Sequence, residues 1–325
     1  MMISQQTDSA WINVFITSAY TDDEPISSIF KYAALDKLKK YKVVKNADIA
    51  DIILFVENSR HVADRFYKKL KQHHLVKKYP QKVFMYNPHD KPWLVLPGLY
   101  ASMPKRFFNK NFIAASPYIE NINPYIKHEL GIAPKYLFTF VGSSNSPPRR
   151  KILRLQHPRG ILQASLKNMF GDKDHRRDKI DYAELIGQSK FVLCPRGAGT
   201  SSFRIFETMQ AGRVPVIISD DWVAPQGPVW KDFALFVAER DVFNIPLILE
   251  KAEHEWEERA ALSRQAWENF FAPEIIFTYL LESIFRLPKT QSEITFSLKA
   301  RHVIPYARYV FRVVFIQPLK ALIAY

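Results

Sequence analysis

Residues 190–207 read KFVLCPRGAGTSSFRIFE, an apolar run that passes through a glycine-containing loop into an amphipathic segment. This order predicts a buried strand, a loop, and a helix that begins near Ser201. A helix N-terminus presents unpaired amide N–H groups and a partial positive charge, so it is a natural site for a diphosphate. Gly197 and Gly199 would let the backbone approach that anion closely.

Three polar residues, Ser201, Arg204 and Glu207, recur at three-residue steps and therefore lie along one side of the expected helix. Arg204 can donate paired N–H groups to a leaving diphosphate. Glu207, one turn further along, can accept hydrogen bonds from ribose hydroxyls. The alternative is an Arg204–Glu207 pair on a helix surface, behind a loop that is only structural.

The next stretch, residues 211–220, reads AGRVPVIISD, a helix stop followed by an almost wholly apolar run. A parallel strand covered on both faces has this composition, and α/β folds bind ligands at the carboxyl ends of such strands. Asp220 is therefore expected either to point into a cleft or to cap the turn that ends at Pro225.

The same alternation extends through both halves of the chain. Strands are expected at 11–17, 51–56, 82–86, 111–115, 137–141, 191–194, 214–219 and 233–237. Helices are expected at about 27–40, 60–78, 181–188, 201–211 and 254–270, with one opening near residue 149. Alternating strands and helices predict an α/β protein with parallel βαβ units. We expect two Rossmann-like doubly wound domains, residues 1–134 and 135–270, and a C-terminal helical tail, 271–325.

The strings around the central loop resemble the C-terminal signature of exostosin-like proteins, glycosyltransferase family 47. The matching residues are 191–197, 202–207 and 211–220, followed by Pro225 and Trp230, with a further stretch at 138–142 and Arg149–Arg150. Together they lie within residues 137–250, roughly a third of the chain. Such a combination is far more specific than a single glycine motif.

The resemblance implies a GT-B architecture, in which two Rossmann-like domains face a cleft and the C-terminal one holds the donor. It also implies inverting transfer from a UDP-sugar, with a GDP-sugar as the alternative. Donor-binding residues are then expected at Gly142, Ser143, Arg149, Arg150, Pro195, Arg196, Gly197, Gly199, Ser201, Ser202, Arg204, Glu207 and Asp220. For Arg149 and Arg150, a solvated basic helix start is the competing interpretation.

The catalytic base is expected on a loop that follows a strand of the first domain. Two loops qualify, residues 20–24 and residues 87–90, and we favour His89 or Asp90 in the second. An Asx-type turn with an exposed histidine is the alternative there. The Asp172-Lys173-Asp174 string fits a divalent metal motif, but it lacks a preceding apolar strand, so we expect a polar loop, no metal and no cofactor.

The formal net charge is +14, which favours anionic partners, and the single cysteine suits a reducing compartment. With no leader visible at the N-terminus, we expect a cytoplasmic enzyme of polysaccharide or cell-envelope glycan biosynthesis with a glycan or lipid-linked acceptor. The basic, aromatic segment 296–325 either lies on the inner face of a membrane or packs back onto the core. A non-catalytic glycan-binding protein and a nucleic-acid-binding protein remain as alternatives, although we recognise no nucleic-acid module.

Overall fold

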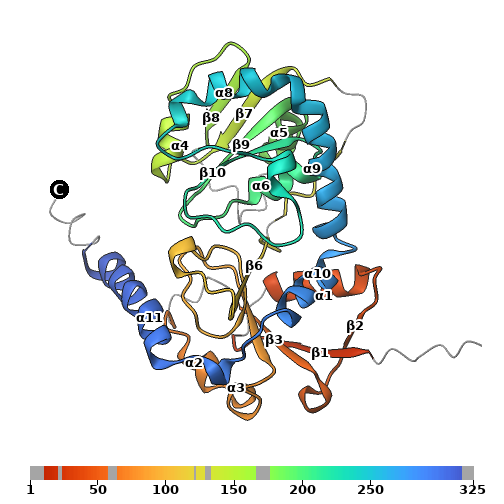
Figure 1. Cartoon of the computed structure of the whole chain (residues 1–325), viewed down its shortest axis with the longest axis vertical. Coiled ribbons are helices and arrows are strands. Elements are labelled where there is room, and N and C mark those ends of the chain that lie inside the picture. Colours follow the sequence, from red (N-terminus) through yellow and green to blue (C-terminus); the bar gives the residue numbers. More distant parts are fainter. Residues whose placement is uncertain are drawn as a thin grey trace, which may run out of the picture.

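The computed structural model describes residues 11–20, 24–57, 64–120, 122–128, 133–165 and 176–316. These residues form two β-sheets, one from each half of the sequence, and each sheet is packed against helices (Figure 1). The strand order is β2-β1-β3-β4-β5-β6 in the first sheet and β11-β10-β9-β7-β8 in the second. All strand pairs of the two sheets are parallel, which confirms the predicted α/β class.

The strands are β1 (Ile12–Thr17), β2 (Tyr41–Val43), β3 (Ile52–Val56), β4 (Val83–Asn87), β5 (Gly98–Tyr100), β6 (Ile113–Ala115), β7 (Tyr136–Gly142), β8 (Gly160–Ala164), β9 (Ser189–Pro195), β10 (Val214–Ile218) and β11 (Leu235–Phe236). The helices are α1 (Glu24–Leu35), α2 (Lys68–Gln72), α3 (His74–Lys78), α4 (Pro147–Ile152), α5 (Arg176–Gly187), α6 (Phe203–Gln210), α7 (Trp230–Phe233), α8 (Ile245–Ala252), α9 (Trp256–Phe270), α10 (Ile276–Phe285) and α11 (Phe296–Phe311). The first sheet ends at Ala115 and the second begins at Tyr136.

The central strands are apolar because both faces of each sheet are covered. Every residue of β3, β4 and β10 is buried. In β3, Ile52 and Leu54 pack into the core that contains residues of α1, whereas Ile53 and Phe55 pack into a second core with residues of α2 and α3. Because successive side chains of a strand point to opposite faces of the sheet, they alternate between the two cores.

The tail returns to the first half of the chain after α9 (Figure 1). Helix α10 packs against α1, where Thr278 Oγ1 donates a hydrogen bond to Asp36 Oδ2 over 3.1 Å. Helix α11 buries Tyr306 and Val310 in the core of the first half. A single hydrophobic cluster therefore extends from the α1 side of the first sheet through α10 to α6 and α9 beside the second. Two Rossmann-like sheets joined in this way confirm the predicted GT-B architecture.

Several elements differ from the sequence-based expectation. The helix expected at 60–78 consists, within the described residues, of α2 and α3, which His73 separates with an extended backbone (φ −58°, ψ 135°). The strand expected at 233–237 is shortened to β11, because α7 includes Phe233. Strands β2 and β5 were not expected, since three residues carry too little periodicity to be recognised. Helix α6 begins at Phe203, two residues later than expected.

Candidate active site

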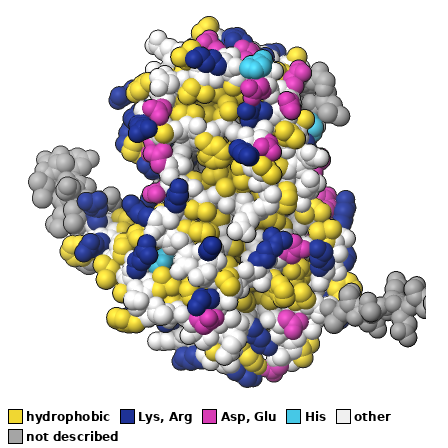
Figure 2. Space-filling model, in the orientation of Figure 1, with side chains coloured by type: hydrophobic (Ala, Val, Ile, Leu, Met, Phe, Trp, Pro, Cys, Tyr) yellow, Lys and Arg dark blue, Asp and Glu magenta, His cyan; other side chains and the backbone are white. Residues whose placement is uncertain are grey.

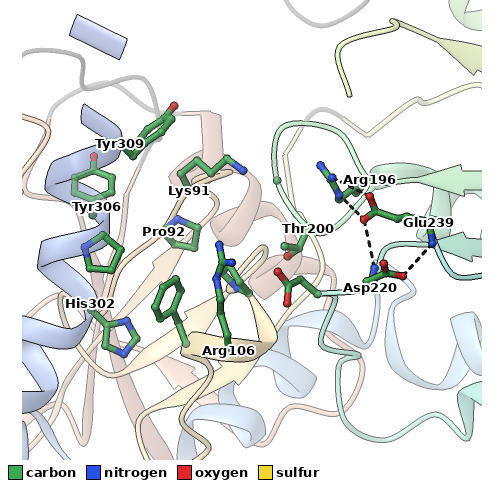
Figure 3. A pocket seen from close by; sticks show the side chains of 15 residues that line it. Lys91, Pro92, Arg106, Arg196, Thr200, Asp220, Glu239, His302, Tyr306 and Tyr309 are labelled. Atoms are coloured by element: carbon green, nitrogen blue, oxygen red, sulfur yellow. Dashed lines mark hydrogen bonds and ion pairs between the residues drawn. The ribbon is translucent and has the colours of Figure 1, made fainter. Parts of the chain in front are cut away.

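The carboxyl ends of strands from both sheets border a pocket of about 490 Å³. Lys91 and Arg106 line it from the first half of the chain, and Arg196 and Thr200 line it from the second. Helix α11 contributes a third wall through His302, Tyr306 and Tyr309 (Figure 3). Ligands of parallel α/β folds bind at this edge of the sheet, so the pocket has the position expected of a substrate site.

Arg196 lies in the pocket with its charge already compensated. Its Nε and Nη2 donate to the two carboxylate oxygens of Glu239 over 2.6 and 2.9 Å (Figure 3). Asp220 also lines the pocket, and its Oδ1 accepts the amide N–H of Glu239 over 3.0 Å. Glu239 was not among the site residues predicted from sequence, although its place just after a strand of the second sheet was a usable signal.

Two guanidinium groups lie beside the start of α6, that of Arg204 buried and that of Arg149 partly buried. Arg149 donates to Ser143 Oγ over 3.1 Å and to the carbonyl of Arg196 over 3.2 Å. Arg204 is 7% exposed, donates to the carbonyl of Val141 and lies over the ring of Phe140. Burial, and then the charge of Arg204, lower the pKa of Arg149 to about 9.

Neither of these two arginines has an ion-pair partner among the carboxylates that the structure describes. Their approach requires glycine nearby: a Cβ on Gly142 would overlap the guanidinium of Arg204, and one on Gly197 would lie 3.0 Å from Nη2 of Arg149. The carboxylates of Asp90 and Glu207 act on these arginines only as neighbouring charges, without an ion pair. Two cations so close together are costly unless a bound anion compensates them. The arrangement can therefore bind a doubly charged anion.

The residues just before α6 add further polar groups to this place. The hydroxyls of Ser201 and Ser202 are buried and have no hydrogen-bond partner within the described part of the chain. The amides of Thr200 and Ser201 donate to the Ser102 hydroxyl, which follows β5, over 2.6 and 3.2 Å. Buried hydroxyls without a hydrogen-bond partner are uncommon in folded proteins, so a bound ligand is a natural partner for these two.

We expected Arg204 itself to face a donor cleft, but its side chain is only 7% exposed, and the pocket borders Arg196, Gly199 and Thr200 instead. Glu207 also differs from expectation: it accepts a hydrogen bond from Tyr182 over 2.8 Å, and burial raises its pKa. It lines a separate cavity of about 70 Å³ among mainly apolar side chains. A ribose contact by Glu207 is therefore not favoured by this geometry.

Two other predicted donor residues lie at the edges of the site. Pro195 is buried at the end of β9. Arg150 is exposed on α4 and donates to the carbonyl of Ser144, as the solvated interpretation expects. Their roles in donor binding stay predictions.

The two candidate bases differ in what they face. The Asp90 carboxylate accepts a hydrogen bond from the Tyr118 hydroxyl over 3.0 Å, and a Cβ on Gly199 would lie 2.6 Å from its Oδ1. His89 Nδ1 accepts the amide N–H of Lys91 over 2.8 Å, so the neutral ring carries its proton on Nε2 and has no free acceptor. The geometry favours Asp90.

In the other candidate loop, residues 20–24, Tyr20 donates to Asp64 over 2.6 Å, and residues 21–23 lie outside the described residues. Among the residues that the structure describes, no group of three or more His, Cys, Asp or Glu side chains is placed to hold a metal ion. The Asp172-Lys173-Asp174 string also lies outside them. Transfer without a metal stays a prediction.

Comparison with known protein families gives a match over most of the chain. The family model of the exostosin GT47 domain matches residues 3–252, which extends well beyond the C-terminal signature. The exostosin-1 homolog of Caenorhabditis elegans is 35% identical over 113 residues, 34% of this chain and 30% of the relative. Exostosin-1 of Drosophila melanogaster is 32% identical over 167 residues, 44% of this chain and 22% of the relative. These matches span less than a third of either relative.

Among solved structures, a glycosyltransferase from Rickettsia africae ESF-5 aligns over 86% of this chain and 99% of its own, with 8% identity and a TM-score of 0.43.

Proposed function

The chain belongs to the exostosin GT47 family, a family of glycosyltransferases. We propose that it transfers the sugar of a UDP-sugar to a saccharide acceptor with inversion and releases UDP. The acceptor is a glycan or a lipid-linked saccharide of cell-envelope polysaccharide synthesis, and the reaction takes place in the cytoplasm. A GDP-sugar is the alternative donor. The proposal rests on the family and on the groups gathered at the start of α6.

One observation supports the donor site above all. The buried Arg204 and the partly buried Arg149 lie close enough for their charges to interact, and neither forms an ion pair with a described carboxylate. The hydroxyls of Ser201 and Ser202 have no hydrogen-bond partner among the described residues. A nucleotide diphosphate supplies two charges and several acceptor oxygens, which match two guanidinium forks and two hydroxyl donors. As the glycosidic bond breaks, these groups stabilise the negative charge that develops on the diphosphate.

The acceptor occupies the pocket on the side of the first half of the chain. Asp90 removes the proton of the attacking hydroxyl, and the oxygen attacks the anomeric carbon opposite the departing diphosphate. The Tyr118 hydroxyl, which donates to Asp90, keeps the carboxylate turned toward Gly199. One displacement on one face inverts the anomeric configuration.

The test compares nucleotide binding by two neighbouring arginine variants. We expect UDP to stabilise the native protein against heat, and Arg149→Met to weaken UDP affinity about 30-fold, since a charged hydrogen-bond donor contributes about 2 kcal/mol. Arg150→Met, which removes the same charge one residue away, is expected to change affinity less than about twofold. The same measurement with GDP in place of UDP shows which nucleobase the donor site prefers.

Equal affinities in the two variants would reject the proposed donor site. Binding of UDP without release of UDP from any UDP-sugar would instead indicate a non-catalytic relative.

A further inference from the structure

The outward side of α11 carries basic and apolar residues in alternation. Arg301, Ile304, Arg308 and Phe311 recur at three- and four-residue steps, so they form one stripe along the helix, and all four are exposed. The opposite side buries His302, Tyr306 and Val310 against the first half of the protein. The helix is therefore held in place, with a mixed basic and apolar stripe facing outward.

Acidic side chains are missing from this helix. Between Thr295 and Ile316 there is no aspartate or glutamate, whereas Lys299, Arg301, Arg308 and Arg312 are exposed. Figure 2 shows dark blue basic and yellow apolar side chains beside one another where α11 lies. Phe296 at its start is 87% exposed, and Ile304 is 51% exposed.

The positive surface continues onto the neighbouring helix α2. Burial lowers the pKa of Lys71 of α2, the charge of Asp64 opposes this shift, and the charges of Lys299 and Lys68 lower the pKa further. Asp64, whose charge acts on Lys71, accepts hydrogen bonds from the Tyr20 hydroxyl and from the backbone amides of Lys68 and Lys69. Exposed cations of α2 and α11 thus lie near one another, and Lys71 Nζ sits 5.3 Å from the centroid of the Trp93 ring.

We propose that the outward stripe of α11, with the adjoining lysines of α2, binds the surface of an anionic lipid bilayer. Basic residues are attracted to the headgroups, while Phe296 and Ile304 enter the boundary between headgroups and acyl chains. Arginine stems lie along the apolar region and keep their guanidinium groups in water. No helix of the described residues has the length and hydropathy that crossing a bilayer requires, so α11 lies along the surface.

The inner side of the same helix lines the pocket through His302, Pro305 and Tyr306. A bilayer bound to the outer stripe would therefore bring lipid-linked molecules to the mouth of the pocket. This step rests on the proposed function, whereas binding of the bilayer does not.

The experiment measures cosedimentation of the full chain with two kinds of vesicle, phosphatidylcholine alone and phosphatidylcholine mixed with phosphatidylglycerol. We expect binding to the anionic vesicles only, weakened by salt. Arg308→Glu with Arg312→Glu is expected to lower the partition coefficient roughly 25-fold or more, because each basic residue near such a surface contributes a factor of about five. The matched control, Lys42→Glu with Lys45→Glu, changes net charge equally around β2 and is expected to keep binding within about twofold.

A second pair of variants tests the apolar contribution. Phe296→Ser with Ile304→Ser is expected to lower binding roughly tenfold or more, because two exposed apolar side chains no longer enter the bilayer. Ile49→Ser with Phe285→Ser removes comparable exposed side chains elsewhere and should have no effect. Circular dichroism and the thermal midpoint check that each variant folds.

Three results would overturn the proposal: no binding of the unaltered chain to anionic vesicles, equal losses in a variant pair and its control, or salt-dependent binding to duplex RNA but not to vesicles. A chain that binds vesicles but no nucleotide would reject the proposed function and leave this inference standing.

Discussion

The hydroxyl of Ser102 lies 2.6 Å from the amide nitrogen of Thr200, and it also accepts the amide N–H of Ser201. This contact joins the end of β5 in the first sheet to the residues that precede α6 in the second half of the chain. These are amides at the helix start, where the sequence predicts that a diphosphate binds. A diphosphate bound there would compete with the serine hydroxyl for them.

Removal of that hydroxyl should have two opposite effects. We expect Ser102→Ala to lower the free energy of unfolding by about 1–2 kcal/mol, because two buried N–H groups lose their acceptor. UDP affinity is expected to rise, since the competing group is gone. Denaturant titration and calorimetry measure the two quantities. Ser116→Ala, which removes a buried hydroxyl without a described partner, is the control and should change neither. A loss of UDP affinity in Ser102→Ala would contradict the assignment.

A methyl group at Gly199 should force the two halves of the chain apart. The added Cβ would lie 2.6 Å from Asp90 Oδ1 and 3.1 Å from Asp90 Cα, and it would overlap Ser102 Oγ. We expect Gly199→Ala to cost about 1–3 kcal/mol of stability and to lower transferase activity. Gly187→Ala makes the same change where no atom lies within 4 Å, and it should be tolerated. Equal thermal midpoints in the two variants would refute the close approach.

The base can be identified by two conservative substitutions. Asp90→Asn keeps an acceptor for the Tyr118 hydroxyl but cannot take up a proton, so kcat should fall about 10²- to 10⁴-fold with little change in donor affinity. His89→Gln should leave kcat within a few-fold, because the His89 acceptor nitrogen is already engaged by the Lys91 amide. If His89→Gln lowers kcat more than Asp90→Asn does, His89 is the base and Asp90 is not.

His302 should make stability depend on pH. Burial, followed by the charge of Arg301, lowers the pKa of His302 to about 4 from an ordinary value of 6.5. Below pH 6.5 the unfolded chain takes up a proton that the folded protein does not, so stability falls until the pH reaches about 4. At pH 5 the loss is about 2 kcal/mol.

We expect His302→Phe to remove most of this loss between pH 7 and pH 5, whereas the same change at exposed His254 should not. Urea denaturation at the two pH values provides the comparison, and an unchanged pH dependence in His302→Phe would be the contrary result.

The central strands could be predicted from sequence because their composition reflects burial on both faces. The stretches 51–56 and 214–219 differ from the observed β3 and β10 by a single residue at one end. Short strands such as β5 could not be found in this way. Gly98–Tyr100 is a strand only because β4 and β6, from elsewhere in the sequence, lie on either side of it.

The site residues that could be predicted are those whose role follows from their position within a single strand–loop–helix segment. The order of strand, loop and helix placed Arg204 next to the start of α6, and the resemblance added Arg149. What each side chain faces depended on partners far away in the sequence: Glu239 for Arg196, Tyr182 for Glu207, and Ser102 for Thr200. Helical periodicity gives the side of a helix but not the element packed against it.

The return of α10 onto α1 sets a rule for recombining this chain with a relative. An exchange made only in the segment between β6 and β7 would leave Asp36 and Lys40 of one parent facing Thr278 and Glu282 of the other. A functional hybrid therefore needs two junctions, with the tail inherited from the same parent as the first sheet.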